Sequence, residues 1–78
     1  MFIIKHSVQN RSDEVIRDGL LPLGGATYDE CSPLMEQQAK TFDHHGYEGQ
    51  HDRWWGWDES TREEVHYWWT VPVGGSDQ

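Results

Sequence analysis

Apolar and polar side chains alternate at the start of the chain, and this alternation predicts a first strand over residues 2–8. Successive side chains of a strand point to opposite faces of its sheet. One face of this strand would carry Phe2, Ile4, His6 and Val8. The polar pair Asn10 and Arg11 is expected to end it.

The next stretch predicts a short helix between Ser12 and Gly19. The Ser12 side chain can cap the first turn, and the negative charges of Asp13 and Glu14 are favoured near the N-terminal end of a helix. Glycine is typical of the position that follows a helix. The leucines of residues 20–23 follow no regular period, and we expect them to cover one end of the core.

A longer helix is predicted after Ser32, which forms a suitable N-cap and first-turn pair with Pro33. Three apolar side chains recur at the spacing of one helix face, namely Met35, Ala39 and Phe42. Gly46 suits the left-handed position at the end of this helix. An earlier start within residues 28–31 is an alternative that the sequence leaves open.

Two aromatic-rich stretches, residues 50–58 and 63–72, predict strands that are joined by the polar turn 59–62 and form a hairpin. The polar residues 74–78 are expected to be a flexible tail. Together these elements predict one compact α+β domain over residues 1–78. Its simplest architecture is a small, mostly antiparallel sheet of about three strands, with a main helix packed on one face and a second short helix.

The aromatic side chains of this hairpin must lie on both faces of the sheet, because tryptophans occupy adjacent positions. In the last strand we expect the core face to consist of Val65, Tyr67, Trp69 and Val71. His66 and Trp68 then point the other way. One helix covers only one side, so Trp54 and Trp68 are expected on the open side, where large aromatic residues often mark contact sites. The alternative is that the first helix and the leucine segment fold over them.

The chain is strongly acidic, with fourteen Asp and Glu residues against six Lys and Arg residues and a formal net charge of −8. Direct nucleic-acid binding needs Lys and Arg to neutralise phosphates, and an anionic membrane surface would repel the chain. No apolar run approaches the length that spans a bilayer. A basic protein surface is therefore the expected partner, unless the charge serves only to keep a small protein in solution.

Candidate chemical groups are few. Cys31 is the only cysteine, which leaves no disulfide within the chain and favours a reducing compartment. Residues 43–45 and 51–52 bring histidines and carboxylates together, but their spacing matches no helical metal motif. No nucleophile elbow or phosphate-binding glycine motif is present. We therefore expect no catalytic residue, no cofactor and no metal.

One sequence pattern is shared with enzymes. His6-Ser7-Val8, followed by Ile16 and by the segment Gly19-Leu20-Leu21-Pro22, resembles the opening strand and helix of ADP-ribosyltransferase-like and RNA 2′-phosphotransferase folds. This resemblance implies that His6 contacts a nicotinamide cofactor and that Tyr28 or Tyr47 stacks on it. A later catalytic glutamate cannot be placed, and a capped helix before an apolar turn explains the same residues.

In overall type the chain resembles the small phage-encoded inhibitors of bacterial defence, anti-CRISPR proteins in particular. The shared features are a very short α+β domain, an acidic charge, the lack of a catalytic motif and a dense aromatic surface. The resemblance implies a non-catalytic protein that docks on the basic channel of a CRISPR effector and blocks target DNA sterically or by mimicry. The residues expected to contact that partner are Trp54, Trp68, His66, Asp52, Asp58, Glu59, Glu63 and Glu64.

Two other functions stay open at this point. The first is a small enzyme, or an enzyme remnant, that binds a nicotinamide cofactor. The second is a generic interaction adaptor or a homodimer. The expected partner is a basic protein surface, such as a CRISPR effector subunit, and neither nucleic acid nor a membrane. The expected assembly is a monomer or homodimer, and the expected compartment is the cytoplasm of a bacterial host cell.

Overall fold

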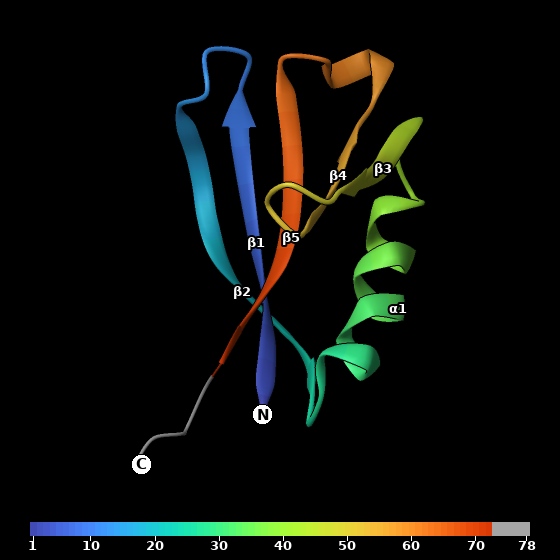
Figure 1. Cartoon of the computed structure of the whole chain (residues 1–78). Coiled ribbons are helices and arrows are strands. Elements are labelled where there is room, and N and C mark those ends of the chain that lie inside the picture. Colours follow the sequence, from blue (N-terminus) through green and yellow to red (C-terminus); the bar gives the residue numbers. More distant parts are fainter. Residues whose placement is uncertain (73–78) are drawn as a thin grey trace.

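The computed structural model describes residues 1–72, which form a five-stranded antiparallel sheet with one helix packed against it (Figure 1). Its elements, in chain order, are β1 (Phe2–Asn10), β2 (Val15–Gly25), α1 (Tyr28–Ala39), β3 (His44–Glu48), β4 (Arg53–Trp57), the 3₁₀ turn η1 (Glu59–Thr61) and β5 (Glu64–Pro72). The strands lie in the order β2-β1-β5-β4-β3. The first and last strands of the described chain are therefore neighbours in the middle of the sheet.

The pairing of β1 with β5 forms the centre of the sheet. It runs antiparallel without interruption from Phe2 opposite Pro72 to Asn10 opposite Glu64. The other edge of β1 pairs with β2, and the remaining edge of β5 pairs with β4. β1 therefore has a partner strand along each edge, and its Ile4 side chain is fully buried in the core between the sheet and α1.

The short helix predicted between Ser12 and Gly19 is wrong, because this stretch turns and then enters strand β2. The side chain of Asn10 organises the turn, since its Oδ1 accepts hydrogen bonds from the backbone N–H groups of Ser12 (2.9 Å) and Glu14 (3.0 Å). Asp13 takes a positive φ of 66° in the same turn, a conformation that Asp tolerates better than most residues. Side chains of the helix-capping type thus serve a hairpin turn here.

Helix α1 begins at Tyr28, which is earlier than the predicted start after Ser32. Thr27 and Glu30 form a capping box: the Glu30 N–H donates to Thr27 Oγ1 (3.3 Å), and the Glu30 carboxylate accepts from the Thr27 N–H (3.2 Å). These reciprocal bonds satisfy free N–H groups of the first turn. The alternative of an earlier start is therefore correct, and Pro33 lies inside the helix.

The apolar stripe of the predicted helix is confirmed at Met35 and Ala39, which are both buried. The helix ends at Ala39, however, and Phe42 lies beyond it while still packing against the core. Gly46 is not a helix-capping residue, since it lies in strand β3. The prediction thus identified the buried face of α1 and missed the strand that follows.

The predicted fold class is corrected by these elements. Residues 1–72 contain five strands and one helix, where the sequence pattern predicted about three strands with a main and a second short helix. The expected hairpin is confirmed, because β4 and β5 pair antiparallel across the connection at 58–63. The predicted tail at 74–78 lies outside the described residues. No helix within residues 1–72 is both long and apolar enough to cross a membrane.

Helix α1 covers one face of the sheet and forms the core with it. The buried core cluster consists of Ile4, Cys31, Met35, Ala39 and Trp68. Partly buried residues packed against this cluster are Phe2, Leu21, Leu23, Tyr28, Leu34, Phe42 and Trp54. We call the side under α1 the covered face and the opposite side, over which residues 1–72 place no further helix or strand, the open face.

Candidate binding surface

Four half-buried aromatic side chains lie on the open face: Trp55, Trp57, Tyr67 and Trp69. They alternate along β4 and β5 with Gly56, which packs under Phe42, and with Trp68, which lies in the core. Successive side chains of a strand point to opposite faces, so these four point away from α1. We call them the aromatic layer.

The predicted assignment of the two faces of β5 is therefore wrong. Trp68, which was expected on the open side, is only 2% exposed and lies in the core. Trp54 stands opposite it in β4 and packs against the same core, and His66 lies on the same covered face. The alternation was identified correctly, but both faces of β5 carry large apolar side chains. The small side chains of α1 in this core, Cys31 and Ala39, leave room for an indole beneath the helix.

Trp57 lies between a histidine and two arginines. Its indole stacks on His44 of β3, with ring centroids 4.0 Å apart. The guanidinium of Arg11 lies 4.6 Å from the indole centroid, and that of Arg62 lies 6.0 Å away. Arg11 Nε also donates to the backbone carbonyl of Arg62 (2.5 Å). These contacts join the β1–β2 turn to the β4–β5 connection.

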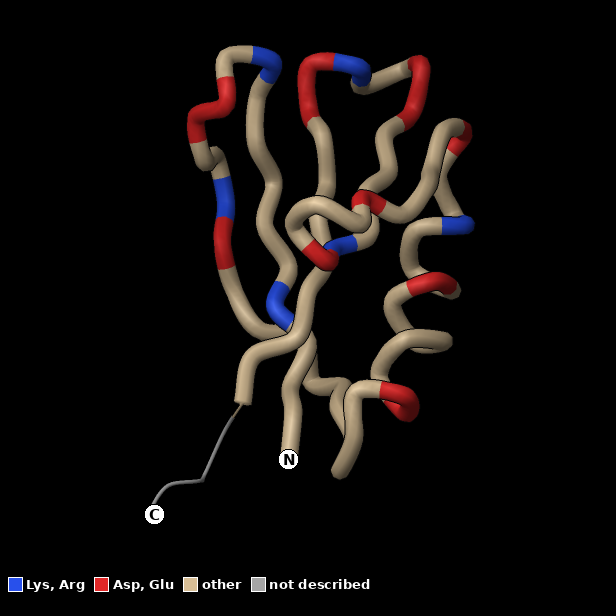
Figure 2. The backbone as a smooth tube through the Cα atoms, viewed as in Figure 1, with Lys and Arg blue, Asp and Glu red and all other residues tan. Residues whose placement is uncertain are grey.

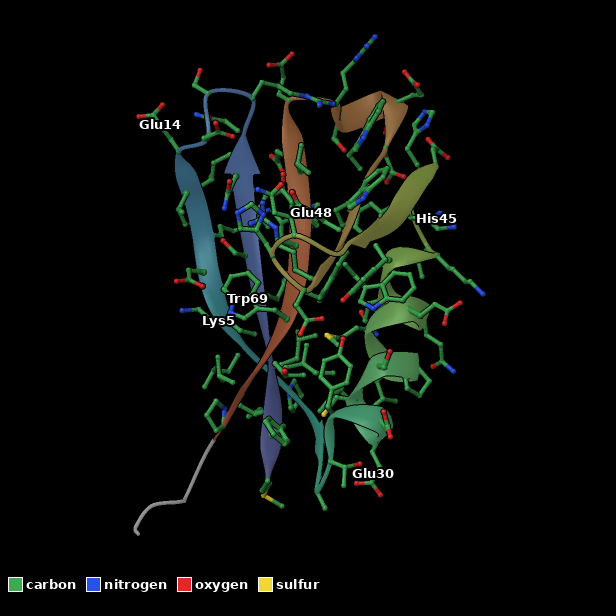
Figure 3. The ribbon with its side chains drawn as sticks, in the orientation of Figure 1. Lys5, Glu14, Glu30, His45, Glu48 and Trp69 are labelled. Carbon is green, nitrogen blue, oxygen red and sulfur yellow. The ribbon has the colours of Figure 1, made fainter. Side chains whose placement is uncertain are left out.

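Tyr67 and Trp69 each have one cation of the chain over the ring. The guanidinium of Arg53 lies 3.9 Å from the Tyr67 centroid, and its Nε donates to Glu48 Oε1 (2.5 Å). Lys5 lies 5.7 Å from the Trp69 centroid, and the two side chains are neighbours in Figure 3. A cation over an aromatic face stabilises by about 0.5–1 kcal/mol at exposed sites. The aromatic layer is thus held in place partly by basic residues of the same chain.

The open face carries most of the basic residues of an acidic chain. Four of the six Lys and Arg residues contact the aromatic layer: Lys5, Arg11, Arg53 and Arg62. The overall charge gives no indication of this grouping. Strand alternation was the available signal for two of them, because it places Arg53 on the face of Trp55 and Lys5 on the face of Ile3.

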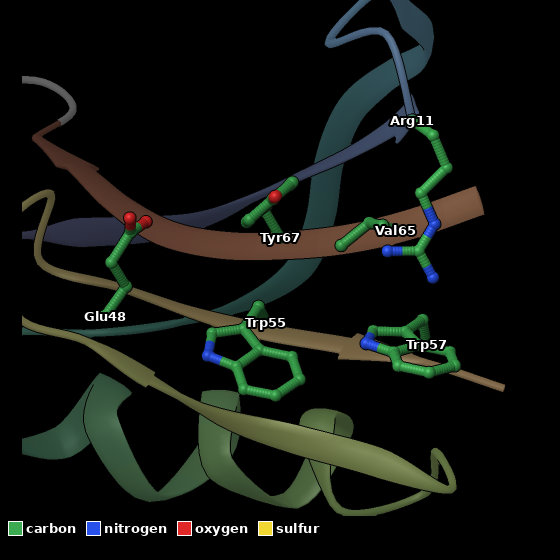
Figure 4. Close-up of a pocket in the computed structure, with 6 residues that line it drawn as sticks. All are labelled: Arg11, Glu48, Trp55, Trp57, Val65 and Tyr67. Carbon is green, nitrogen blue, oxygen red and sulfur yellow. The ribbon is translucent and has the colours of Figure 1, made fainter. Parts of the chain in front are cut away.

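Trp55 packs against the backbone of β3. It stands opposite Gly46, and a Cβ atom at Gly46 would lie 2.7 Å from the indole. A residue with a side chain at this position would therefore clash with the ring. The ring also borders an open pocket of about 270 Å³. The pocket is lined by Arg11, Glu48, Trp55, Trp57, Val65 and Tyr67. Figure 4 shows Glu48 and Arg11 at its two ends, with Trp55 between them.

Several Asp and Glu residues, with Lys or Arg residues among them, lie where the β1–β2 turn and the β4–β5 connection are side by side, at the end of the molecule that is uppermost in Figure 2. We call this region the acidic end. Four of the predicted contact residues lie in it, namely Asp58, Glu59, Glu63 and Glu64. Glu59 pairs with His44 (2.6 Å), and Glu64 pairs with Arg17 (3.0 Å). Of these four, Glu59 is linked to Trp57 through His44, which stacks on the indole.

Asp52, another predicted contact residue, lies away from the acidic end in the β3–β4 turn, where its φ is 50°. The hydroxyl of Tyr28 donates to its Oδ1 (2.8 Å), and the hydroxyl of Tyr47 donates to the same oxygen. The hydrogen bonds from Tyr47 and Tyr28 lower the pKa of Asp52. Burial, followed by the hydrogen bond to Asp52, raises the pKa of Tyr28. This cluster ties the turn to the start of α1.

The arrangement that the ADP-ribosyltransferase-like resemblance implies is not found. Residues 16–22 lie in strand β2, where the resemblance calls for the end of a helix. His6 is half-buried on the covered face and is hydrogen-bonded to His66 (2.8 Å). Burial lowers the pKa of both rings. The hydroxyls of Tyr28 and Tyr47 converge on a carboxylate of the β3–β4 turn and not on His6.

The histidine-rich stretch does not converge on one point. His44 contacts Glu59, whereas the Nδ1 atom of His45 lies 3.3 Å from the carbonyl of Phe42. Within residues 1–72 no group of three or more His, Cys, Asp and Glu side chains is arranged to hold a metal ion. The single thiol, Cys31, is buried in the core.

Comparison with known proteins gives no relative for this chain. No protein-family model matches it, and neither a curated protein sequence nor a solved structure does. Function is therefore inferred from the open face, the acidic end and the net charge.

Proposed function

We propose that the chain is a non-catalytic binding protein that holds a basic protein surface against the open face of its sheet. The observation that carries the proposal is the aromatic layer, which no helix or strand of residues 1–72 covers. Trp, Tyr and Arg are the residue types that most often dominate binding energy at protein interfaces. All three types occur together on the open face, around the pocket beside Trp55.

The net charge of −8 supports a basic partner. Opposite charge on two proteins speeds their encounter and orients them before contact. Glu59 of the acidic end pairs with His44, which stacks on Trp57, so the carboxylates of this end can pair with Lys and Arg side chains at the rim of the same interface. The aromatic layer would then supply the desolvated centre of the interface and the acidic end would supply its charged rim.

The proposed activity is inhibition of a complex that handles nucleic acid. Such complexes carry basic channels that neutralise phosphates. An acidic protein docked on one of them takes the place of the phosphates and blocks nucleic acid sterically or by mimicry. The resemblance in overall type to anti-CRISPR proteins makes a CRISPR effector complex the first partner to test.

The test is the binding of the chain to a purified CRISPR effector complex, measured with and without target DNA. We expect the chain to bind the complex and to reduce its affinity for DNA. The double variant Trp57→Leu, Trp69→Leu should bind at least about tenfold more weakly, because it removes two aromatic anchors of the interface. The control is Tyr47→Leu, which replaces an exposed aromatic residue on the covered side of β3 and should bind as the parent does.

Three results would overturn the proposal. The first is full affinity of the double variant for the complex, with its fold verified by circular dichroism. The second is no binding of the parent chain to the complex at all. The third is tight binding of the chain to single-stranded DNA alone. In that case the aromatic layer and its four cations would serve as a stacking platform for bases.

A further inference from the structure

Trp55 differs from the rest of the aromatic layer because no cation of residues 1–72 lies over its ring. The cation–π contacts within these residues are Arg53 to Tyr67, Arg11 and Arg62 to Trp57, and Lys5 to Trp69. One side of the Trp55 ring packs on β3 at Gly46, and the ring borders the open pocket. Trp55 therefore offers a free aromatic surface in a layer whose other rings already hold guanidinium or ammonium groups.

Glu48 adds a carboxylate to the same pocket, at the end opposite Arg11 (Figure 4). Its Oε1 accepts from Arg53 Nε (2.5 Å), and its Oε2 lies 3.1 Å from Nδ1 of His51. The hydrogen bond from Arg53 keeps the pKa of Glu48 below its ordinary value, so the group is ionised. Each oxygen of an ionised carboxylate can accept more than one hydrogen bond. Glu48 can therefore accept a further donor without releasing its present partners.

We infer that this pocket binds an arginine side chain of the partner, with its guanidinium stacked on Trp55 and hydrogen-bonded to Glu48. The inference rests on the proposed function, which supplies a basic partner. A guanidinium is planar, stacks on aromatic faces and presents paired N–H donors to a carboxylate, whereas a lysine ammonium is a strongly hydrated point charge. Arg11 lies at one end of the pocket, and Arg53 is bonded to Glu48 at the other, so Glu48 and the Trp55 ring must hold the inserted guanidinium between these two cations.

The test compares two peptides of equal length, one with several arginines and one with citrulline, the neutral isostere, at the same positions. Each is titrated into the isotope-labelled chain while the indole N–H signals are followed by NMR. We expect a saturable shift that is largest for Trp55, and a citrulline peptide that binds at least about threefold more weakly. Trp55→Leu and Glu48→Gln should each weaken binding of the arginine peptide by about threefold or more.

Two further variants keep the test decisive. Trp55→Phe retains an aromatic face and should retain most of the binding, whereas Tyr47→Leu removes an exposed aromatic ring on the covered side of β3 and should change little. Backbone signals in the same spectra report whether each variant is folded. Equal affinity for the two peptides, or unchanged affinity of a folded Trp55→Leu variant, would falsify the inference.

Failure of the inference and failure of the proposed function give different results. In one outcome, binding to the basic complex needs Trp57 and Trp69, but the Trp55→Leu and Glu48→Gln variants bind as tightly as the parent. That outcome contradicts the arginine site and supports the interface. An arginine peptide that binds at Trp55, together with a complex that does not bind the chain, supports the site and contradicts the inhibitory function.

Discussion

The imidazole rings of His6 and His66 share one hydrogen bond, with Nε2 of His6 lying 2.8 Å from Nδ1 of His66. One ring must donate its N–H while the other accepts with its unprotonated nitrogen, so the bond requires that at least one ring is neutral. Both rings stack near Trp68, at centroid distances of 5.2 and 5.9 Å. The ring of Phe42, from the segment after α1, packs on His66 at 4.5 Å. The pair therefore joins β1 to β5 beside the core.

We predict that the free energy of unfolding decreases as the pH falls from about 7 to about 5. Burial is the main cause that lowers the pKa of both histidines from 6.5. The charges of His66 and Arg17 lower the pKa of His6 further, and the charge of Arg17 lowers that of His66. Glu64 and Asp58 act in the opposite direction on His66. Between the lower pKa of the folded state and the ordinary pKa, the unfolded state binds more protons. The contribution of the histidine pair to the free energy of unfolding is therefore fully present above about pH 6.5, and it is lost as the pH falls through the folded-state pKa.

Urea unfolding at a series of pH values measures this dependence. His66→Gln removes one of the paired imidazoles and should flatten the decrease between about pH 7 and about pH 5. The matched control, His51→Gln, replaces an exposed histidine outside the pair and should keep the slope of the parent. A slope that is the same in His66→Gln and in the parent would contradict the assignment to this pair.

Trp68 and Trp69 are neighbours in sequence but should respond very differently to truncation. Trp68→Ala removes an indole from the core and should cost about 3–5 kcal/mol, which is a large part of the stability of a small domain. Trp69→Ala removes a half-buried ring from the open face and should cost about 1–2 kcal/mol. Urea unfolding of the two variants measures the difference. Equal losses would mean that the two faces of β5 are buried alike.

Two glycines of β2 should differ in their tolerance of a methyl group. A Cβ atom at Gly24 would lie 2.3 Å from the backbone oxygen of Phe2, so Gly24→Ala forces the backbones apart and should cost about 1–3 kcal/mol. At Gly19 nothing lies within 4 Å of such an atom, and Gly19→Ala should be neutral or slightly stabilising, because alanine restricts the unfolded chain. Thermal unfolding of the two variants tests the contrast, and a stable Gly24→Ala protein would contradict the close pairing of β1 with β2.

Three substitutions of Asp52 should separate its backbone role from its hydrogen bonds. Asp52→Asn keeps an acceptor for Tyr28 and Tyr47 and tolerates the positive φ, so it should be the mildest change. Asp52→Ala and Asp52→Gly both remove the acceptor, but alanine also pays a conformational cost of about 1 kcal/mol at this φ. We therefore expect urea unfolding to rank the variants Asn, Gly, Ala in falling stability. Alanine equal to glycine would show that the backbone conformation is not a constraint.

The parts of the fold that the sequence predicts correctly are those where local and long-range preferences agree. Aromatic and β-branched residues make up most of 53–57 and 64–72, so strand propensity and sheet pairing coincide in the last hairpin. Met35 and Ala39 recur at helical spacing and are buried by the sheet as that spacing implies. Such elements are predictable because their local sequence preference agrees with their pairing and burial in the folded chain.

Strand β2 is not predictable in this way, because its local signals fit two structures. Ser12, Asp13 and Glu14 can begin a helix, and the same residue types also build a hairpin turn around Asn10. The choice depends on β1, which offers a free edge to residues 15–25. Tertiary pairing of this kind often overrides weak helix propensity.

The sequence predicts that the candidate surface carries aromatic side chains, but it does not predict which ones. Alternation correctly required aromatic residues on both faces of β5, but it contains no information on which face a helix will cover. That outcome depends on side-chain volumes in α1, where Cys31 and Ala39 lie in the same core as Trp68. The grouping of cations around Trp57 also depends on a long-range contact, because Arg11 arrives from the β1–β2 turn.

The central pairing of β1 with β5 sets the order in which the chain can fold. The hairpins β1–β2 and β3–β4–β5 close short loops, whereas the strands that join them lie at opposite ends of the described sequence. Helix α1 contacts strands from both halves, so its apolar stripe stays in water until they meet. Closing such a long loop is entropically slow. A nascent chain should therefore remain open to chaperones and proteases until β5 has emerged, and a truncation within β5 should leave two hairpins without a core.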